Sequence, residues 1–434
     1  MKKILFVEKR LRIDKLAVCY LAAVLKKAGH EVTLLQNDIE DVDGYLVQNP
    51  QDFVMFSVTS DEASWVSQRN RELKSKHRFI TAVGGPHPTF VPSWGTEDEA
   101  IDYVVQGPGE DVILNIVNGS AERLTRGNLL GRFNYISPDR SILYKYPEFG
   151  QSRMKRFVAC RYCLFSCRHC FNSAFKGLYP DQKECLAYRP PAKTMIQEIQ
   201  EVKREYGLSI AFFNDDDIAG DPNWIAEFCE LLTIEDNGVG FISSIRADSV
   251  NKERVAMMAK AGCFMLNIGL ESANTETQKL LRRGPVTNEQ IYQATRWCEE
   301  AEIKVRLQVM IGLPVEDPLA DALETYEFAL KCGATDVSPT IYTPLPGTSL
   351  WGYCVEKGLI NQDTQTGSYF FKTVLRIPDA EKINRLGKLF PSAFWEKWPT
   401  EKLRRQLEIP MSDAEMIKLT QRARDICKEK LYGI

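Results

Sequence analysis

Short apolar runs alternate with amphipathic helical patterns over the first 118 residues of the chain. The first run predicts a buried strand at residues 3–7, and the next pattern predicts a helix at residues 16–28 that ends at Gly29. Further strands are expected at residues 31–35, 53–58, 79–83 and 101–105, with helices near residues 64–76 and 110–117. This alternation predicts a doubly wound α/β fold, a parallel sheet with helices on both faces whose ligands bind at the carboxyl ends of the strands.

A second alternating block starts near residue 156, after a connector of about residues 119–152 that Gly, Asn, Asp and Pro punctuate. Its strands are expected at residues 156–160, 209–213, 240–245, 264–268, 305–311 and 336–341, and its helices near residues 194–206, 224–232, 252–261, 288–301 and 319–331. Thr287 and Gln290 predict a capping box at the start of one of these helices. Six strand–helix units are too few for a full eight-fold barrel, so a partial barrel is expected.

The pattern changes after residue 345, where aromatic residues cluster and a charged amphipathic helix closes the chain. The aromatic residues are Phe370, Phe371, Phe390, Phe394, Trp395 and Trp398. We predict a small, mainly helical cap in which these side chains pack rather than bind substrate. The expected domains are residues 1–135, 136–345 and 346–434.

Composition narrows the class of protein. A length of 434 residues is too great for one ordinary hydrophobic core, so two or three domains are expected. Hydrophobic residues make up 44% and the net charge is -3, which leaves no basic excess for a nucleic-acid surface. The chain runs directly into a strand rather than a signal peptide and has no apolar run that would span a bilayer. We therefore expect a cytoplasmic protein without membrane partners, whose twelve cysteines are reduced thiols.

Three of these cysteines, Cys163, Cys167 and Cys170, have the spacing C-x3-C-x2-C. Three thiolates and no fourth would hold a 4Fe–4S cluster with one iron open to an outside ligand, because a cluster normally takes four cysteines. The alternative is a structural zinc site, since Cys160 could complete two C-x2-C pairs. Only three residues separate those pairs, which is fewer than zinc ribbons use. The spacing therefore favours the cluster, with Cys160 as the last residue of the preceding strand.

This motif resembles that of the radical S-adenosylmethionine (SAM) enzymes, whose open iron binds SAM through its amino and carboxylate groups. The resemblance implies a radical SAM partial (β/α)6 barrel, in which an electron from the cluster breaks a carbon–sulfur bond of SAM and yields a 5′-deoxyadenosyl radical. The site residues that it implies lie on the loops at the carboxyl ends of the strands. The candidates for binding SAM are His169, Asp215, Asp216, Arg246, Glu271, Gln308 and Gly312.

Some of these candidates carry alternatives. Asp215 or Asp216 is expected to bind the SAM ammonium, unless these carboxylates only cap a helix or face solvent. Arg246 either pairs with the SAM carboxylate or forms a salt bridge with Glu271, which in relatives faces SAM. The stretch that ends at Gly312 resembles the one whose backbone lies along the adenine.

The order of motifs along the chain resembles the cobalamin-binding radical SAM family. The matches are residues 20–32, Gly84-Gly-Pro-His87, Gly107-Pro-Gly-Glu110, residues 268–272 and residues 311–314. In cobalamin mutases and methionine synthase the first loop carries D-x-H-x-x-G, and here Asp14 takes the place of the cobalt-ligating histidine. Many members of the family bind cobalamin without that histidine. The cobalamin-binding candidates are Asp14, Ser57, Thr59, Ser60, Gly84, Gly85, His87 and Gly107; the alternative is a degenerate Rossmann-like domain without a ligand.

Two functions follow from the resemblance. The first is cobalamin-dependent C-methylation of an unactivated carbon in a small-molecule substrate of a biosynthetic pathway. The second is a cobalamin-independent dehydratase, isomerase or redox enzyme that acts on a sugar-like or natural-product substrate. A non-catalytic iron–sulfur or zinc protein is a third class. An electron donor such as flavodoxin or ferredoxin is the expected protein partner, and the sequence does not name the substrate or the oligomeric state.

Overall fold

The structure is a computed structural model that describes residues 1–129, 131, 135–235, 238–284, 286–362, 364, 372–427 and 431. Phe370 and Phe371, two members of the predicted aromatic cluster, lie outside these residues. The chain forms two compact units. The first unit contains Met1–Phe157, Ala174–Pro190 and Gln197–Ser209, and the second contains Val158–Ser173, Pro191–Ile196 and Ile210–Ile434.

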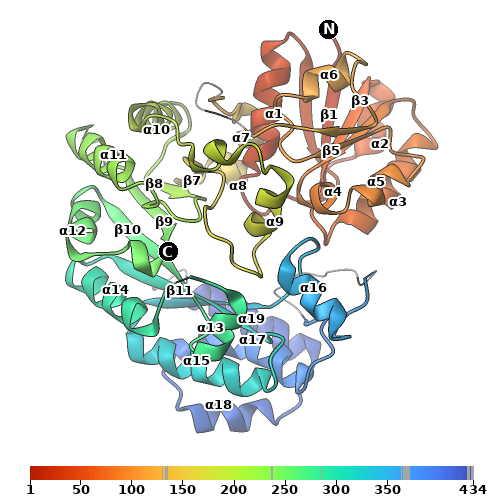
Figure 1. The fold of residues 1–434 in the computed structure, drawn as a ribbon. Helices are drawn as coiled ribbons and strands as arrows, with labels where there is room; N and C mark the ends of the chain where they lie inside the picture. Colours follow the sequence, from red (N-terminus) through yellow and green to blue (C-terminus); the bar gives the residue numbers. More distant parts are fainter. Residues whose placement is uncertain are drawn as a thin grey trace. The chain divides into compact units, whose positions relative to one another are not determined.

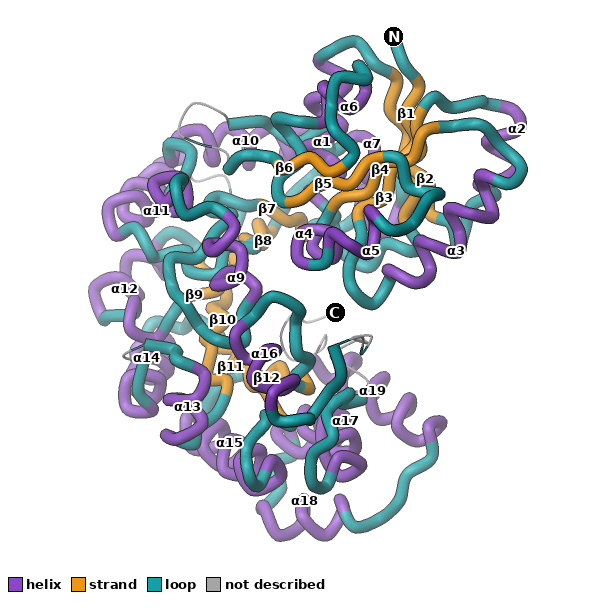
Figure 2. The backbone as a smooth tube through the Cα atoms, turned by 45° about the vertical axis from the view of Figure 1, so that its right-hand side comes forward, coloured by secondary structure: helices purple, strands orange, loops and turns teal. Residues whose placement is uncertain are grey.

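The first unit is built on a parallel sheet with the strand order β2-β1-β3-β4-β5-β6 (Figures 1 and 2). Its strands are β1 (Lys3–Glu8), β2 (Glu31–Gln36), β3 (Phe53–Ser57), β4 (Ile80–Gly84), β5 (Tyr103–Gln106) and β6 (Leu124–Arg126). The order reverses direction between β1 and β3, which makes their carboxyl ends the switch point where such sheets bind ligands. The predicted doubly wound fold is confirmed, and β6 is a short strand within the predicted connector.

Helices cover both faces of this sheet because its strands are apolar on both sides. They are α1 (Leu16–Lys27), α2 (Val42–Gln48), α3 (Ala63–Lys74), α4 (Pro86–Phe90), α5 (Pro92–Thr96) and α6 (Ile113–Val117). Leu5, Val54 and Val83 belong to one buried core together with Val66 of α3. The first helix ends where the sequence predicts, because Gly29 takes a φ of 84° that favours glycine.

Residues of the predicted connector form a buried polar network within the first unit. The segment contains α7 (Ser141–Tyr144) and α8 (Pro147–Gly150), which the sequence analysis did not predict. Arg140 Nη2 donates to Glu198 Oε1 at 2.6 Å, and both side chains are only 4% exposed. Tyr135 donates its hydroxyl to the other oxygen of Glu198 at 2.5 Å, and Arg140 Nη1 donates to the Tyr144 hydroxyl at 2.8 Å. The described residues of the connector therefore pack as part of the first unit rather than as a linker.

The second sheet has the strand order β12-β11-β10-β9-β8-β7 and forms the predicted partial barrel (Figure 2). Its strands are β7 (Met154–Phe157), β8 (Ile210–Phe213), β9 (Gly240–Ile245), β10 (Cys263–Glu271), β11 (Lys304–Ile311) and β12 (Asp336–Ile341); the last five lie in the second unit. From β8 to β12, each strand pairs with the next in parallel. β10 is longer than the sequence predicts, so that Glu271 is its last residue rather than a loop residue.

Helices follow the strands in the expected alternation. They are α9 (Phe171–Leu178), α10 (Ala192–Tyr206), α11 (Pro222–Glu235), α12 (Lys252–Lys260), α13 (Thr275–Leu281), α14 (Asn288–Glu300) and α15 (Pro318–Cys332), with 3-10 turns at Lys183–Ala187 and Ala247–Ser249. The capping box at Thr287 and Gln290 is confirmed at the start of α14. None of the helices in the described ranges is long and apolar enough to cross a bilayer.

The chain ends in α16 (Ser349–Glu356), α17 (Ala380–Trp395), α18 (Thr400–Leu407) and α19 (Asp413–Cys427). Phe390 and Phe394 are buried, and Phe390 meets the ring of Tyr326 edge to face at 5.2 Å. The Tyr326 hydroxyl lies within hydrogen-bond distance of the carbonyls of Ala393 and Trp398. These described aromatic side chains pack in the interior, as predicted.

The Arg140–Glu198 pair gives a prediction about stability. Arg140→Met should lower the free energy of unfolding by about 3–5 kcal/mol, because it leaves the Glu198 carboxylate buried without its cation. Urea-induced unfolding measures the change. Arg204→Met is the matched control, since Arg204 and Glu205 are 70% and 43% exposed and their pair should contribute at most about 0.5 kcal/mol. Equal losses in both variants would contradict a stabilising role specific to the buried pair.

Candidate functional site

The three cysteines lie on the segment between β7 and α9, which we call the cysteine loop (residues 158–170). Cys163, Cys167 and Cys170 are all half-buried free thiols. The loop is held at its centre, where Arg168 N donates to the carbonyl of Leu281 at 2.9 Å and Leu350 N donates to the carbonyl of Arg168 at 3.0 Å. The ends of α13 and the start of α16 therefore fix the part of the loop that joins two of the cysteines.

A buried carboxylate holds the start of the cysteine loop. Asp215, two residues after the end of β8, is 1% exposed and accepts the main-chain N–H of Ala159 at 2.9 Å and of Cys160 at 2.7 Å, one on each oxygen. These donors precede the first cysteine of the motif by a few residues. Asp215 thus binds the backbone that leads into the loop. Both of its oxygens have main-chain partners, whereas the sequence analysis expected Asp215 or Asp216 to bind the SAM ammonium.

The other two carboxylates of this run have separate partners. Asp216 Oδ2 accepts the side-chain amide of Asn172 at 2.8 Å, and burial is the main cause that raises the pKa of Asp216. Asp217 accepts the hydroxyl of Ser249 at 2.8 Å. Asp216 raises the pKa of the Cys163 and Cys170 thiols, although less than burial does, so its carboxylate lies near the cysteine loop. Asp216 is therefore the better placed of the two predicted residues for a cationic ligand near the thiols.

The thiols themselves fit a cluster. Burial raises the pKa of all three, that of Cys170 to about 12, so that a bound cation is needed to hold them as thiolates. Among the described residues, no three His, Cys, Asp or Glu side chains converge as they would around a single metal ion. A 4Fe–4S cluster does not need its ligands to converge on one point, because each thiolate binds its own iron. The anchored loop supplies three such thiols, from Cys163, Cys167 and Cys170.

Cys160 is placed differently from the other three. It is 5% exposed, and its Sγ donates to the carbonyl of Tyr162 at 3.1 Å. A zinc site of four thiolates would need this sulfur without its proton and turned toward the other cysteines. The contact with its own loop favours three ligands over four.

The carboxyl end of β10 is irregular at Glu271. The pairing of β10 with β11 shifts between Gly269 and Glu271, and Glu271 adopts a φ of 60°. Its carboxylate lies 3.9 Å from Arg283 Nη2, with side-chain exposures of 17% and 7%. Arg246 instead forms a bidentate pair with Asp248, at 2.9 and 2.8 Å. Arg246 thus pairs with Asp248, a partner that the sequence analysis did not name, and its contact with the SAM carboxylate stays a prediction.

The remaining SAM candidates lie on or beside this sheet edge. Gln308 is half-buried on β11 and pairs in register with Gly269 of β10. Gly312 has a φ of 70°, and a Cβ there would come within 2.8 Å of the Ile383 side chain of α17. His169 has a buried Nδ1 without a hydrogen-bond partner, and burial lowers the pKa of its ring. Gly312 therefore accommodates the protein's own helix, whereas His169 keeps a polar atom for a further group.

The switch point of the first unit carries a charged cluster that the sequence analysis missed. Lys15 Nζ donates to Glu8 Oε2 at the end of β1 and, at 2.7 Å, to the carbonyl of Ser57 at the end of β3. Glu62 Oε2 lies 3.9 Å from the same ammonium. Glu8 is 3% exposed, its Oε1 has no partner, and burial raises its pKa to about 7. A single lysine thus bridges the two strands between which a ligand is expected.

At two of the three predicted glycines of this edge, other atoms of the protein fill the space that a side chain would need. A Cβ at Gly85 would lie 2.8 Å from Val58 N, and one at Gly107 would lie 1.7 Å from the hydroxyl of Tyr179. At Gly84 the nearest atom would be Val105 Cβ at 3.6 Å, which is ordinary contact. Gly85 and Gly107 therefore serve close packing inside the first unit, and only Gly84 leaves room beside the strand end.

His87 is the predicted residue here that keeps an open polar atom. Its Nδ1 lies 3.1 Å from Ser60 Oγ, its ring meets Trp94 edge to face, and its buried Nε2 has no partner. Thr59 donates its hydroxyl to Asp61 at 2.6 Å. Burial lowers the pKa of His87 to about 4, so the imidazole is neutral at pH 7. The His87 Nε2 and Glu8 Oε1 atoms are the two orphaned polar atoms at this edge that a ligand would satisfy.

Asp14, in the position of the missing histidine, faces the polar network. Its Oδ2 accepts the Tyr144 hydroxyl at 3.0 Å and the main-chain N–H of Arg156 at 3.1 Å. The residue is 9% exposed. The side chain thus anchors the connector, and the neighbouring Lys15 is the one that reaches the switch point.

Sequence reasoning also missed Asn172 and Arg283 in the second unit. Asn172 follows the motif by two residues, a position that could have marked it as a loop partner. Arg283 lies twelve residues beyond Glu271, and no local signal connects the two. Asn267 of β10 is a third, 3% exposed with an Oδ1 that lacks a partner.

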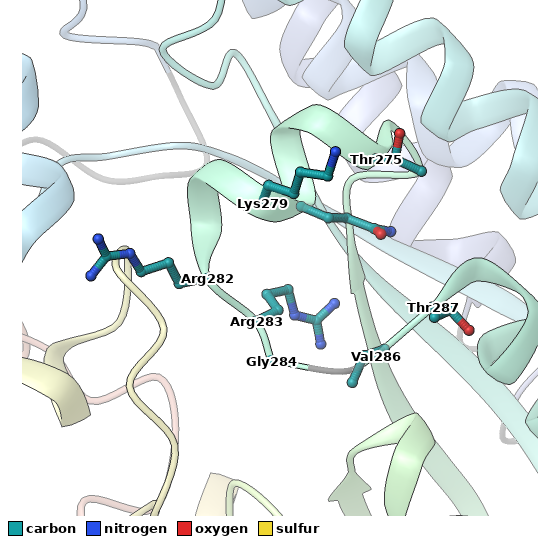
Figure 3. Close-up of a pocket in the computed structure, with 8 residues that line it drawn as sticks. Thr275, Lys279, Arg282, Arg283, Gly284, Val286 and Thr287 are labelled. Atoms are coloured by element: carbon teal, nitrogen blue, oxygen red, sulfur yellow. The ribbon is translucent and has the colours of Figure 1, made fainter.

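A cavity of about 490 Å³ lies beside α13 in the second unit (Figure 3). It is lined by Thr275, Gln278, Lys279, Arg282, Arg283, Gly284, Val286 and Thr287. Lys279 pairs with Glu276 at 2.6 Å, while Arg283 belongs to the contacts around Glu271. The cavity is thus next to the turn that supports the end of β10.

Two family models match the chain, each on one of the blocks described above. The model for the B12 binding domain matches residues 2–117, and that for the radical SAM superfamily matches residues 157–329. The chain therefore combines a B12-binding domain with a radical SAM domain. The radical SAM domain implies a 4Fe–4S cluster and SAM as cofactors, and the B12-binding domain supports cobalamin as a third.

Curated relatives span most of the chain. An uncharacterised methyltransferase, PH0819, of Pyrococcus horikoshii is 23% identical over 80% of this chain and 79% of its own length. An anaerobic magnesium-protoporphyrin IX monomethyl ester cyclase of Rubrivivax gelatinosus is 25% identical over 84% of this chain and 70% of its own. Cytidylyl-2-hydroxyethylphosphonate methyltransferase of Streptomyces wedmorensis is 19% identical over 87% and 85%, respectively.

Solved structures share the fold. The cobalamin-dependent SAM radical enzyme OxsB, with aqua-cobalamin and SAM bound, matches with a TM-score of 0.70 and 14% identity, covering 99% of this chain and 72% of that one. The radical SAM methyltransferase TsrM of Kitasatospora setae, with tryptophan and a SAM analogue, matches with a TM-score of 0.67 and 16% identity over 82% and 76%. Both confirm the two-domain α/β fold class.

Asp215 gives a prediction about cluster assembly. Asp215→Asn should weaken the loop anchor by about 1–3 kcal/mol, because an amide cannot accept from both N–H groups. Iron bound per chain after anaerobic reconstitution should fall. The matched control is Asp221→Asn, since Asp221 caps the first turn of α11 and asparagine caps equally well. An undiminished iron content in Asp215→Asn would contradict the anchoring role.

His87 gives a prediction about pH. Its pKa is about 4 in the folded protein and 6.5 in the reference state, so the unfolded chain binds the extra proton between these values. The free energy of unfolding should therefore fall as the pH drops from 6.5 toward 4. Urea titrations of wild type and His87→Gln at several pH values isolate this contribution as a difference. A difference that does not change across this window would contradict the burial of a neutral imidazole.

Proposed function

We propose that this chain is a cobalamin-dependent radical SAM methyltransferase that methylates an unactivated carbon of a small molecule. The observation that carries the proposal is the pairing of a B12-binding domain with a loop that offers the three thiols of Cys163, Cys167 and Cys170, while the thiol of Cys160 donates to a main-chain carbonyl. Two of the relatives named above are described as methyltransferases, which supports group transfer over other radical chemistry.

Cys163, Cys167 and Cys170 would hold the cluster. When bound, the cluster supplies the electron that cleaves SAM to a radical able to take hydrogen from an unactivated carbon. Asp215 fixes the main chain before the first thiol, and Asp216 offers a carboxylate beside the loop for the SAM ammonium. Radical chemistry needs a shielded site rather than an acid–base pair, and the anchored loop is suited to that need.

Further residues would complete the SAM site at the strand ends. Glu271 presents its carboxylate from the end of β10, and Gln308 lies on the neighbouring strand β11, where it pairs with Gly269. His169 Nδ1 is an orphaned polar atom next to the last thiol. We assign these three side chains to SAM recognition, and we assign Arg246 and Gly312 to support of the surrounding backbone.

Glu8, Lys15 and His87 are the residues that we assign to cobalamin, together with the neighbouring Ser57, Thr59, Ser60 and Gly84. Cobalamin, when bound, carries the methyl group to be transferred. Its many amide side chains need hydrogen-bond partners, which the orphaned atoms of Glu8 and His87 would provide. On this proposal residues 1–135 bind cobalamin, residues 136–345 carry the SAM chemistry and residues 346–434 form the cap. A flavodoxin or ferredoxin would supply the electron.

A cobalamin-independent lyase, isomerase or redox enzyme is the second candidate. Two observations favour it: Asp14 replaces the cobalt-ligating histidine and is bound to the connector, and Lys15 fills the switch point. One relative is also described as a cyclase rather than a methyltransferase. The two candidates share the cluster and SAM and differ in the role of the first unit.

The test is to reconstitute the protein anaerobically with iron, sulfide and hydroxocobalamin, and then to remove unbound corrinoid. We expect a retained corrin absorption band and the formation of 5′-deoxyadenosine from SAM under reducing conditions. Cys167→Ala should keep the corrin band and lose 5′-deoxyadenosine. Production of 5′-deoxyadenosine by a protein that retains no corrin would contradict methyl transfer and favour the second candidate.

A further inference from the structure

Glu271 has an unusual backbone for a residue of its type. Its φ of 60° lies in the left-handed region that side chains other than glycine rarely adopt, and it follows a register shift in the pairing of β10 with β11. Such a conformation persists only where the surroundings hold it. Because it occurs at the strand end that faces the proposed SAM site, the groups that hold it are of functional interest.

Arg283 holds the two residues before Glu271. Its Nη1 donates to the carbonyl of Gly269 and to the carbonyl of Leu270, both at 2.8 Å. These carbonyls lie within the register shift, where the regular ladder of the sheet is interrupted. One guanidinium therefore replaces the strand hydrogen bonds that the shift removes.

The side chains of Glu271 and Arg283 are closely packed against Gly269. A Cβ at Gly269 would lie 2.6 Å from Glu271 Oε1 and 2.8 Å from Arg283 Nη2. The Arg283 side chain is 7% exposed, and Glu271 Oε1 lies 3.9 Å from its Nη2. The Glu271 carboxylate is thus kept near a cation but without a close hydrogen bond to it, so it retains capacity to accept donors from a ligand.

The turn that carries Arg283 also touches the cysteine loop. The carbonyl of Leu281, two residues earlier, accepts the N–H of Arg168, which follows Cys167. The carbonyl of Arg283 itself accepts from Arg246 Nη2 at 3.0 Å. A single turn after α13 therefore contacts both the loop of the three thiols and the end of β10.

We propose that Arg283 is a positioning residue, which sets the Glu271 carboxylate relative to the cysteine loop so that one SAM molecule can contact both. This inference rests on the proposed radical SAM activity and adds a residue to it. Arg283 acts through Glu271 and the backbone of β10, without touching SAM. The neighbouring Arg282 points to the opposite side in Figure 3, and it is exposed.

The test is SAM binding by the reconstituted holoprotein, measured from the change that SAM causes in the EPR spectrum of the reduced cluster. Arg283→Gln should keep the cluster signal and its iron content and raise the apparent Kd for SAM by roughly 10- to 100-fold. Arg282→Gln is the matched control and should stay within about twofold of wild type. An Arg283→Gln protein with an intact cluster and a Kd within twofold of wild type would overturn the inference.

A double-mutant cycle separates positioning from a purely structural role. If Arg283 acts through Glu271, Arg283→Gln combined with Glu271→Gln should bind SAM no more weakly than Glu271→Gln alone. Additive losses would contradict the inference. Should Arg283→Gln fail to fold, Gly269→Ala serves instead, because its methyl group displaces the same two side chains and leaves their charges; an unchanged Kd there would equally overturn it.

The wild-type protein distinguishes this inference from the proposed function. If SAM causes no EPR change in the wild type, the proposed radical SAM activity fails. If the wild type responds and Arg283→Gln responds equally, only the positioning role fails.

Discussion

The proposed function depends on one constraint: three thiols of a short loop must bind one cluster and leave one iron without a protein ligand. Cys160 donates to the carbonyl of Tyr162 and is buried, whereas Cys163, Cys167 and Cys170 remain partly accessible. On the proposal that only these three are ligands, one iron is left for a ligand from outside the protein. The loop conformation is set from several sides, by Asp215 at its start and by main-chain contacts of Arg168 in its middle.

Each unit places its polar groups at the carboxyl edge of a parallel sheet. In the first unit Glu8, Lys15 and His87 gather beside the switch point between β1 and β3. In the second, Asp216 follows β8 and Glu271 ends β10, with β9 between these two strands. Most strand residues of the first sheet are apolar and buried, so its charged groups gather at the strand ends, where the desolvation cost is smaller. The fold therefore sets the position of each candidate site, and the residues of the loops at the strand ends set its chemistry.

Much of the fold could be predicted from the sequence because strand and helix periods are local properties. The strands of both sheets, the end of α1 at Gly29 and the capping box at Thr287 depend on neighbouring residues only. The ordered connector was not predictable, since Arg140 is stabilised by Glu198, which is remote in sequence. The extension of β10 to Glu271 likewise depends on Arg283, a contact that no period reveals.

The residues of the candidate site likewise divide into those that the local sequence predicts and those that depend on distant partners. The spacing of the three cysteines predicts the cluster ligands, and the run of carboxylates follows the end of β8. Which carboxylate faces a ligand depended on distant partners, because Asp215 is taken up by the backbone at residues 159–160. At the first unit, the missing histidine drew attention to Asp14, whereas the residue that reaches the switch point is Lys15, one position further on.

The claim of three protein ligands and one open iron is tested most directly by Cys160→Ala. Iron content and the EPR spectrum of the reduced cluster should be measured with and without SAM, beside wild type. The account predicts that Cys160→Ala assembles the full cluster and responds to SAM as wild type does. Loss of the cluster in Cys160→Ala would show that this sulfur is a ligand and would contradict the account.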